Sequence, residues 1–308
     1  FKGEQNMTAI QKQRLTRRIS KLGFSLLRFI ILFGLAFIIL RPIVTKFLLS
    51  CMNPSDLLDN SVNTIPKHWS LHYWRTAING LNLTKTLPNT VFLSLTVAAL
   101  QVISSVLVGY GLARFNFKLN KLLFGCVLLI MLVPIQTVST AQYLNFVYFR
   151  LGFVTVNLTN TFIPMWLMAI GCTGIKQGLY IYLFKEQFAA IPQELDEAAC
   201  IDGADVWKTF TLVMLPNART TMLTVLLFSV SWQWTDDIYS KLYYPNTDIL
   251  ANLLENVSIR INNAYDVTGT LISRCAATLL IMIPLLILFS FCQKYLVQSI
   301  STSGLSNG

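Results

Sequence analysis

Charged residues are scarce in this sequence of 308 residues. Asp, Glu, Lys and Arg make up 12% of the chain, whereas a soluble globular protein contains about 25%. Hydrophobic residues make up 54% of the positions, and the mean hydropathy is +0.57. This composition excludes an ordinary soluble domain and predicts a polytopic membrane protein.

The sequence also lacks the motifs of common active sites. It contains no G-x-x-x-x-G-K-[ST] phosphate loop, no G-x-S-x-G elbow, no H-E-x-x-H and no G-x-G-x-x-G after a strand. No nucleophile, acid/base pair or group of metal ligands is clustered along the chain, which disfavours a membrane enzyme. If the chain uses ATP, another polypeptide must bind the nucleotide, and we expect no cofactor on this chain.

Cysteine and histidine are too few and too scattered for a disulfide framework or a zinc site. The six cysteines stand singly, at positions 51, 126, 172, 200, 275 and 292, and we expect them to be small apolar side chains in or near helices. The two histidines, His68 and His72, are four residues apart outside the apolar runs. A metal site on this pair is a minor alternative, and we predict no metal.

Six apolar runs are long enough to cross a bilayer, which takes about 18 or more residues. They are residues 24–50, 90–111, 122–144, 161–184, 219–235 and 271–293. Backbone polar groups in lipid must be bonded within their own segment, so we expect an all-α fold with six transmembrane helices. The first run exceeds the roughly 7–15 apolar residues of a cleavable signal peptide, and we interpret it as the first span.

Lys and Arg give the chain a net charge of +10, but they cluster beside the apolar runs. This pattern indicates positive-inside bias and not a nucleic-acid partner. Basic residues are frequent before the first run and after the second, whereas Arg150 alone lies between the third and fourth. We therefore expect both termini in the cytoplasm. The predicted organisation is a tail at 1–23, a first span and outer link at 24–89, a core domain at 90–293 and a tail at 294–308.

The outer link contains the stretch IPKHWSLHYWRTAING, which is too polar to span. Trp69, Tyr73 and Trp74 lie in it, and amphipathic aromatic rings anchor well at a membrane interface. Docking of an external protein is the alternative for these three residues.

The stretch PQELDEAACIDGADVWKTFTLVMLP, residues 192–216, falls on the cytoplasmic side and carries four carboxylates in its first eleven residues. Negative charge in a first helical turn is favoured by the helix dipole, and Gly203 after Asp202 suits a sharp turn. We expect two short helices that meet at an angle, the second ending at Pro216. Apolar Ile201 and Trp207 beside the carboxylates suit a groove in another protein, and an ordinary amphipathic hairpin is the alternative.

This stretch resembles the EAA loop of the permeases of bacterial ABC importers. The pattern is E-A-A, three residues, Gly, nine residues, an aliphatic residue, one residue and Leu-Pro. The sequence has Glu197, Ala198, Ala199, Gly203, Val213, Leu215 and Pro216 at those offsets. The resemblance implies a type I importer fold and a loop that inserts into a cleft of an ATPase subunit. It assigns this coupling role to Glu194, Glu197, Ala198, Ala199, Asp202, Gly203, Leu215 and Pro216.

Other segments resemble carbohydrate permeases of the maltose-transporter type, over about Pro66 to Leu305. They include PNTVFLSLTVAALQVISSVLVGYGLARFNF and SVSWQWTDDIY, in which Thr235 stands where Asn is usual. A longer fourth span resembles a Gram-positive branch, and Cys200 replaces a residue that is often basic. The resemblance implies a subunit of a sugar importer, in particular an oligosaccharide importer, in the bacterial cytoplasmic membrane. A permease for a non-sugar solute is the alternative, followed by a secondary transporter.

The same resemblance implies the partners. They are a second permease, two ATPase subunits that bind ATP and Mg²⁺, an extracytoplasmic solute-binding protein or lipoprotein, the sugar and the lipid bilayer.

Four residues are candidates for the solute path: Lys176, Trp232, Trp234 and Asp236. Lys176 lies inside an apolar run, where ionisable residues are usually functional, although its side chain can also extend to the interface. The tryptophans and Asp236 combine stacking surface with a hydrogen-bonding carboxylate, and an interfacial belt is their alternative. Arg41, next to Pro42 in the first run, is expected to pair with the second permease.

Overall fold

The computed structural model describes residues 2–254, 257, 260–261 and 264–305. Its elements are α1 (Lys2–Ser50), α2 (Pro54–Leu58), α3 (His72–Leu81), α4 (Leu83–Arg114), α5 (Asn120–Leu132), α6 (Ile135–Val147), β1 (Phe149–Leu151), β2 (Val154–Val156), α7 (Ile163–Ile170), α8 (Gln177–Ala189), α9 (Glu194–Ile201), α10 (Val206–Thr209), the π-helical turn η1 (Phe210–Met214), α11 (Leu215–Asn217), α12 (Arg219–Trp234), α13 (Ile238–Tyr243), α14 (Leu250–Leu253), β3 (Arg260–Ile261), β4 (Ala264–Tyr265) and α15 (Val267–Leu305). The strands form two small antiparallel hairpins, β1–β2 and β3–β4. The chain is predominantly helical, as predicted.

Three helical segments of the described chain are long and apolar enough to cross a membrane: Gly23–Ser50, Leu83–Arg114 and Val267–Gln293. Two bent pairs raise the number to five if each pair is one span. They are Asn120–Leu132 with Ile135–Val147, bent by 106°, and Val206–Asn217 with Arg219–Trp234, bent by 73°. The third predicted span is therefore broken, whereas the fifth, predicted over 219–235, corresponds to the 16 residues of α12.

The breaks have local causes. Val133 is extended in front of Pro134 (ψ 123°), because a proline disfavours the helical conformation of the preceding residue. The run 161–184, predicted as the fourth span, is divided into α7 and α8 by the segment 171–176, called here the α7–α8 link. Within this link, Cys172 and Lys176 have left-handed backbone conformations (φ 61° and 55°). Hydropathy shows that a run is apolar, but it does not show that the run is one helix.

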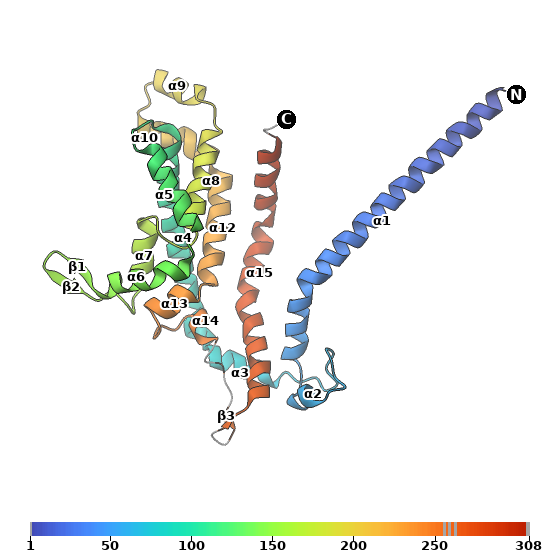
Figure 1. Ribbon diagram of the computed structural model, residues 1–308, viewed down its shortest axis with the longest axis horizontal. Coiled ribbons are helices and arrows are strands. Elements are labelled where there is room, and N and C mark those ends of the chain that lie inside the picture. The colour runs from blue at the N-terminus through green and yellow to red at the C-terminus, as the bar shows by residue number, and fades with distance from the viewer. Residues whose placement is uncertain (1, 255–256, 258–259, 262–263, 306–308) are drawn as a thin grey trace.

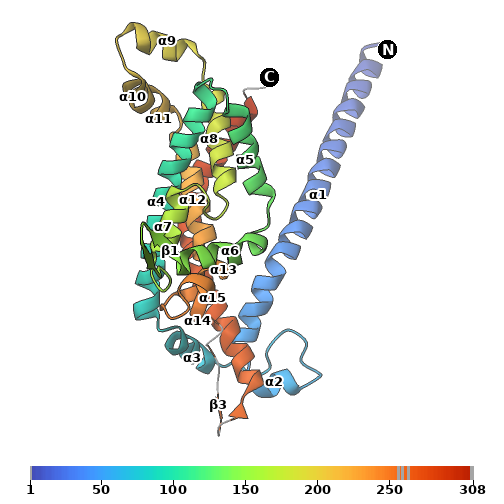
Figure 2. The ribbon, with the colours of Figure 1, turned by 60° about the vertical axis from the view of Figure 1, so that its left-hand side comes forward.

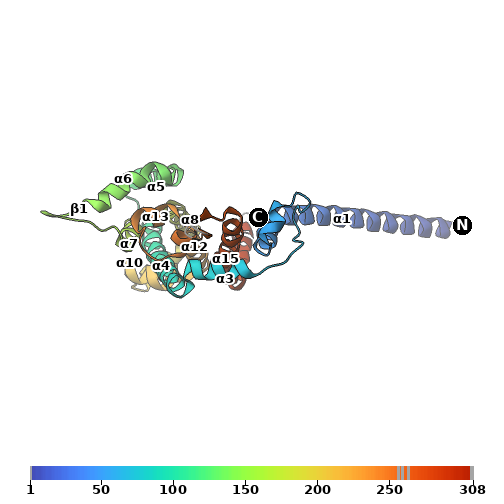
Figure 3. The same cartoon turned by 90° about the horizontal axis from the view of Figure 1, so that it is seen from below.

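The bundle is built around α4, which packs against α8, α12 and α7, while α12 also packs against α15. Figures 1 and 2 show α1 leaving this bundle at an angle and meeting α15 near the end opposite α9. The most apolar window of α1 contains no buried residue. Pro42 lies inside this helix, and the neighbouring Arg41 is exposed. Figure 3, seen from below, shows α1 extending away from the remaining helices.

The α4–α8 contact depends on a missing side chain. A Cβ atom added at Gly109 of α4 would lie 2.5 Å from Cβ of Phe184 and 3.0 Å from the backbone nitrogen of Lys185. In lipid, helices gain little from burying apolar surface, so close approach at small residues supplies much of their attraction. Gly109 thus sets the distance between α4 and α8.

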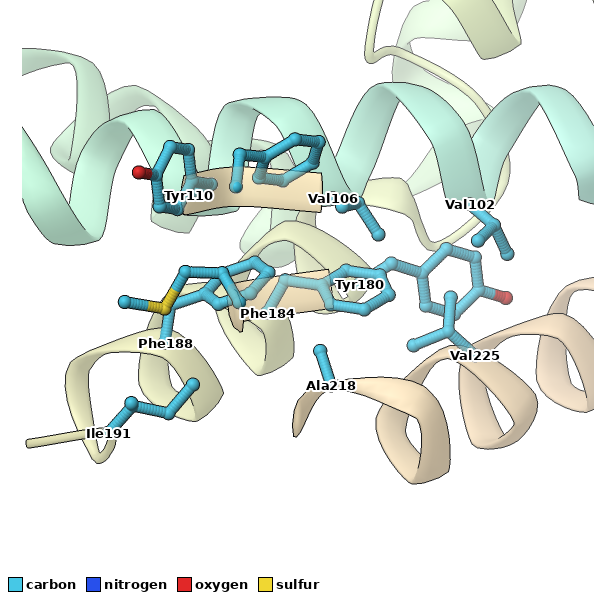
Figure 4. Packing of buried hydrophobic residues seen from close by; sticks show 11 residues of the cluster. Val102, Val106, Tyr110, Tyr180, Phe184, Phe188, Ile191, Ala218 and Val225 are labelled. Carbon is cyan, nitrogen blue, oxygen red and sulfur yellow. The ribbon is translucent and has the colours of Figure 1, made fainter. Parts of the chain in front are cut away.

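Aromatic rings fill the space beside this contact. Figure 4 shows Tyr110, Phe184 and Phe188 from α4 and α8 pointing toward one another, with Ile191 and Ala218 nearby. The ring of Tyr110 lies 5.5 Å from Phe188 and 4.9 Å from Phe210, measured between centroids. This group, called here the aromatic cluster (Val102, Val106, Tyr110, Tyr180, Phe184, Phe188, Ile191, Phe210, Met214, Ala218 and Val225), joins α4, α8, η1 and α12.

The outer link folds back on the end of α1. Met52 and Trp69 form an antiparallel bridge, and the buried Asp56 accepts hydrogen bonds from the backbone nitrogen (2.7 Å) and Nδ1 (2.8 Å) of His68. These hydrogen bonds hold the pKa of the Asp56 carboxyl below its usual range. His68 and Asp56 therefore bond to each other and hold the outer link in this fold. The neighbouring Trp69 is 60% exposed.

A substitution at Gly109 tests the close approach of α4 and α8. We expect Gly109→Val to lower the melting temperature of the detergent-purified chain by several degrees, because overpacking costs about 1–3 kcal/mol. Gly111→Val is the matched control, since an added Cβ there meets no atom within 4 Å. Equal effects of the two substitutions would show that Gly109 does not determine how closely α4 and α8 approach each other.

Candidate functional site

Residues 192–216 protrude from one end of the molecule, on the side where the first turn of α1 and the last turn of α15 lie (Figures 1 and 2). Glu194, Asp196 and Glu197 occupy the first turn of α9, where the helix dipole favours negative charge. Gly203 follows with φ +80°, and the side chain of Asp205 caps α10 by accepting from the backbone nitrogen of Lys208 at 2.7 Å. The prediction of two short helices with a turn at Gly203 is confirmed.

The second helix is less regular than predicted. Only Val206–Thr209 is α-helical, and Phe210–Met214 forms the π-helical turn η1. The backbone nitrogen of Leu215 donates to the carbonyl of Phe210, one residue farther back than in an α-helix. Pro216 follows directly and has no N–H to continue the α-helical pattern. Leu215 and Pro216 are both partly buried.

The outer face of this loop mixes carboxylates with apolar side chains. Glu194, Glu197, Ala198, Asp202 and Gly203 are exposed, and Ala199 is buried. Ile201, Trp207 and Leu212 have 86%, 63% and 72% of their surfaces exposed. The exposed surface of this loop therefore carries both negative charge and large apolar side chains.

Arg114, the last residue of α4, holds the root of the loop. Its Nη2 donates to the carbonyl of Ile191 at 2.7 Å, and its Nε lies 3.3 Å from Oδ2 of Asp196 in α9. The Arg114 side chain is only 7% exposed, so the pair is largely shielded from water. Sequence reasoning treated Arg114 only as part of the positive-inside pattern, and nothing in the spacing of 114 and 196 indicates that they meet.

The root of the loop is also part of the aromatic cluster, through Ile191, Phe210 and Met214. The loop is thus connected to α4 and α8 both by an ion pair and by buried rings. A force on α9 or α10 would reach both helices through these contacts.

A cavity of about 590 Å³ lies at the level where the predicted spans are broken. Its walls are the end of α5 with the start of α6, the second half of the α7–α8 link, and the corner between α12 and α13. The helix breaks therefore form the cavity. This is a usual arrangement at membrane depth, where irregular backbone is tolerated next to a cavity.

Three of the four candidate path residues line this cavity: Lys176, Trp232 and Asp236. Nζ of Lys176 lies 5.0 Å from the ring centroid of Trp232. The Asp236 carboxylate accepts from the backbone nitrogens of Tyr239 (3.2 Å) and Ser240 (2.9 Å), so it also caps α13.

Trp234 lies elsewhere. It is 4% exposed, and its indole N–H donates to the carbonyl of Ile281 at 3.1 Å. The structure brings Lys176, Trp232 and Asp236 together and places Trp234 between α12 and α15.

A buried polar network behind the cavity was not predicted. Gln101 of α4 accepts a short hydrogen bond from Ser229 of α12 and donates to the carbonyl of Ile175 at 3.2 Å. Gln177 donates to Ser104 and to the carbonyl of Ala169, both at 2.7 Å. Its partners lie up to 128 positions apart along the chain, so sequence spacing gives no signal for it.

The chemistry of the cavity suits a polar, uncharged or charged solute held without covalent change. Trp232 offers an aromatic face, Lys176 a cation, and Gln136, Gln142, Thr173 and Thr235 amides and hydroxyls. Within the described ranges, no three His, Cys, Asp or Glu side chains are grouped to hold a metal ion.

The chain is similar to curated permeases over most of its length. It is 24% identical over 279 residues to the arabinooligosaccharides transport system permease protein of Halalkalibacterium halodurans, which covers 88% of this chain and 92% of that protein. It is 26% identical over 274 residues to the osmoprotective compounds uptake permease protein of Synechocystis sp. This match covers 86% of this chain and 87% of that protein.

A solved structure has the same fold. It is the crystal structure of a bacterial ABC transporter involved in the import of the acidic polysaccharide alginate, and one of its chains superposes with a TM-score of 0.65. The match covers 88% of this chain and 96% of that chain at 19% identity.

Residues 105–302 match the family model of the binding-protein-dependent transport system inner membrane component. The match includes the end of α4 from Ser105, the loop 192–216, the cavity and most of α15. The chain therefore belongs to the family of inner membrane components of binding-protein-dependent transport systems.

Proposed function

We propose that this chain is the transmembrane permease subunit of an ATP-driven sugar importer, in particular of an oligosaccharide importer. It forms half of the translocation path and couples to an ATPase subunit through residues 192–216. The observation that carries this proposal is the protruding acidic and apolar loop whose root is held by Arg114 and the aromatic cluster. A loop of this kind can transmit a movement to the bundle.

The coupling residues have distinct tasks in this proposal. Exposed Glu194, Glu197 and Asp202 offer negative charge to a basic groove, and Ala198 keeps the surface of α9 narrow. Gly203 supplies the left-handed turn between the helices. Leu215 and Pro216 end the second helix where the chain bends by 73° into α12.

The solute assignment rests on the cavity and on the relatives. A flat indole beside amides and hydroxyls suits a sugar ring with its hydroxyl groups, and one relative carries arabinooligosaccharides in its name. The relative named for osmoprotective compounds favours the second candidate, a permease of this family for a non-sugar solute.

The partners follow from the family and from the shape of the chain. The uncovered apolar length of α1 fits a second permease beside it. Two ATPase subunits would bind ATP and Mg²⁺, and an external binding protein or lipoprotein would deliver the solute. The chain then spans the bacterial cytoplasmic membrane with both termini and the loop inside; a Gram-positive source is part of the proposal.

The mechanism is a two-state change. Closure of the ATPase dimer on ATP moves the docked loop, and the contacts of Arg114 and Phe210 pass this movement to α4 and α8. The cavity, lined by the ends of broken helices, then opens to the outside and receives the solute. Nucleotide shifts the equilibrium because it binds one state more tightly than the other.

Charge reversal in the loop tests the coupling. We expect Glu197→Lys to lower the ATP hydrolysis stimulated by loaded binding protein at least tenfold, because a lysine would face the basic groove of the ATPase. The chain is co-expressed with its neighbouring permease and ATPase, and hydrolysis is measured with and without the binding protein and candidate oligosaccharides. Any sugar that stimulates hydrolysis identifies the solute.

Glu186→Lys is the matched control for Glu197→Lys. Glu186 is an exposed carboxylate on α8 outside the loop, paired with Lys185 at 2.8 Å, and such surface pairs contribute little. Unchanged hydrolysis and unchanged ATPase retention in Glu197→Lys would remove the coupling proposal.

The pair of Arg114 and Asp196 predicts non-additive effects. We expect Arg114→Gln and Asp196→Asn each to reduce the ratio of stimulated to basal ATP hydrolysis, because either change releases α9 from α4. The double variant should be no worse than Arg114→Gln alone, since residues in direct contact couple by more than about 0.5 kcal/mol. Melting temperatures of the assembled complex provide the second measurement. Additive losses would show that the two side chains act separately.

A further inference from the structure

Lys176 has an unusual backbone conformation for a lysine. Its φ of 55° and ψ of 16° place it in the left-handed region at the start of α8, which glycine adopts freely and residues with a Cβ do not. Gly174 and Gly178 stand on either side, yet the left-handed position falls on Lys176. Such conformations persist where surrounding contacts hold them, and they are concentrated at functional sites.

The buried network supplies those contacts. Oε1 of Gln177 accepts from the backbone nitrogen of Gly174 at 2.9 Å, while its Nε2 donates to Ala169 and Ser104. The carbonyl of Ile175 is held by Gln101 from α4. Gln101 and Gln177 are 1% and 0% exposed, so the residues on both sides of Lys176 are fixed from inside the bundle, while Lys176 itself is exposed to the cavity.

The other charged groups of the cavity wall have partners of their own. The Asp236 carboxylate bonds to the first turn of α13, and Asp237 pairs with Lys241 at 3.6 Å. Within the described part of the chain, no carboxylate lies within ion-pair distance of Lys176. Its ammonium group has the ring of Trp232 at 5.0 Å. An ammonium group without a counter-ion is therefore presented to the cavity.

Lys185 offers a comparison, because its ammonium group has both an aromatic ring and a carboxylate beside it. Nζ of Lys185 lies 4.3 Å from the ring centroid of Phe124, and it also pairs with Glu186 at 2.8 Å. Lys176 has the same kind of ring contact and lacks the carboxylate. The difference between the two lysines is that Lys176 faces the cavity.

We propose that Lys176 recognises an acidic group on the transported sugar: a carboxylate, as in a uronic acid residue, or a sulfate or phosphate ester. The ammonium group binds the anion, and the indole of Trp232, 45% exposed, stacks against the adjoining sugar ring. This inference rests on the proposed function and specifies the class of solute. Opposite charges attract more strongly beside protein, where the effective dielectric constant is low, than in bulk water.

The test uses the assembled complex with its second permease, ATPase and binding protein in lipid nanodiscs. Sugars are compared in pairs that differ only in charge: oligogalacturonate with its methyl ester, and a sulfated oligosaccharide with its unsulfated form. Stimulated ATP hydrolysis is titrated with each sugar. We expect the acidic member of one pair to stimulate, and which pair responds distinguishes a carboxylate from an ester.

Variants connect the response to the site. We expect Lys176→Gln to raise the concentration of acidic sugar needed for half-maximal stimulation at least tenfold, and Lys176→Arg to raise it less than threefold. Lys185→Gln is the matched control. It should leave the concentration of acidic sugar needed for half-maximal stimulation within twofold of the wild-type value. Co-purification of the second permease should be the same for all three variants.

Three outcomes overturn the inference. Stimulation by a neutral sugar that is unchanged in Lys176→Gln excludes an acidic solute and leaves the sugar importer standing. Loss of the second permease from Lys176→Gln in the absence of sugar shows that a carboxylate of that subunit meets Lys176. Stimulation by no sugar of either kind removes the proposed function and the inference together.

Discussion

The structure depends on the close approach of α4 to α8 at Gly109. Without a Cβ at this position, the two backbones come near enough for Tyr110, Phe184 and Phe188 to interlock beside it. Lipid offers no strong reward for burying apolar surface, so a membrane bundle is held by close contacts and internal hydrogen bonds. Gln101 and Ser104 supply such bonds farther along α4. One helix, α4, therefore contacts both the loop 192–216 at its end and the cavity wall near its middle.

The two candidate sites share this helix but differ in construction. The loop is built from a capped helix, a left-handed glycine and a π-helical turn, and its carboxylates Glu194, Glu197 and Asp202 are exposed. The cavity lies where three helical segments are interrupted. Pro134 ends α5, the α7–α8 link separates α7 from α8, and the chain turns after Trp234 at the end of α12. In both places a side chain bonds a backbone nitrogen beside the irregular structure: buried Gln177 at the cavity and exposed Asp205 in the loop.

Sequence reasoning predicted the features that depend on local chemistry. The acidic first turn of α9, the turn at Gly203 and the apolar character of the spans are each determined by neighbouring residues, and the structure contains them. It did not predict that the run 161–184 would break, because hydropathy averages over the Gly171–Lys176 segment. The Arg114–Asp196 pair and the Gln101–Ser229 bond join positions far apart in the chain, and only the tertiary fold brings them together. Trp232 and Trp234 looked equivalent in sequence, but the helix turns one toward the cavity and the other toward α15.

The helix interruptions that line the cavity have a consequence for the evolution of such chains. Membrane insertion selects for the length and apolarity of each run, whereas the cavity wall includes the few residues where a run stops being helical. Residues at these points, such as Lys176 and Thr235, can be exchanged while the hydropathy profile stays the same. The chemistry of the cavity wall can thus diverge among relatives whose hydropathy profiles remain indistinguishable.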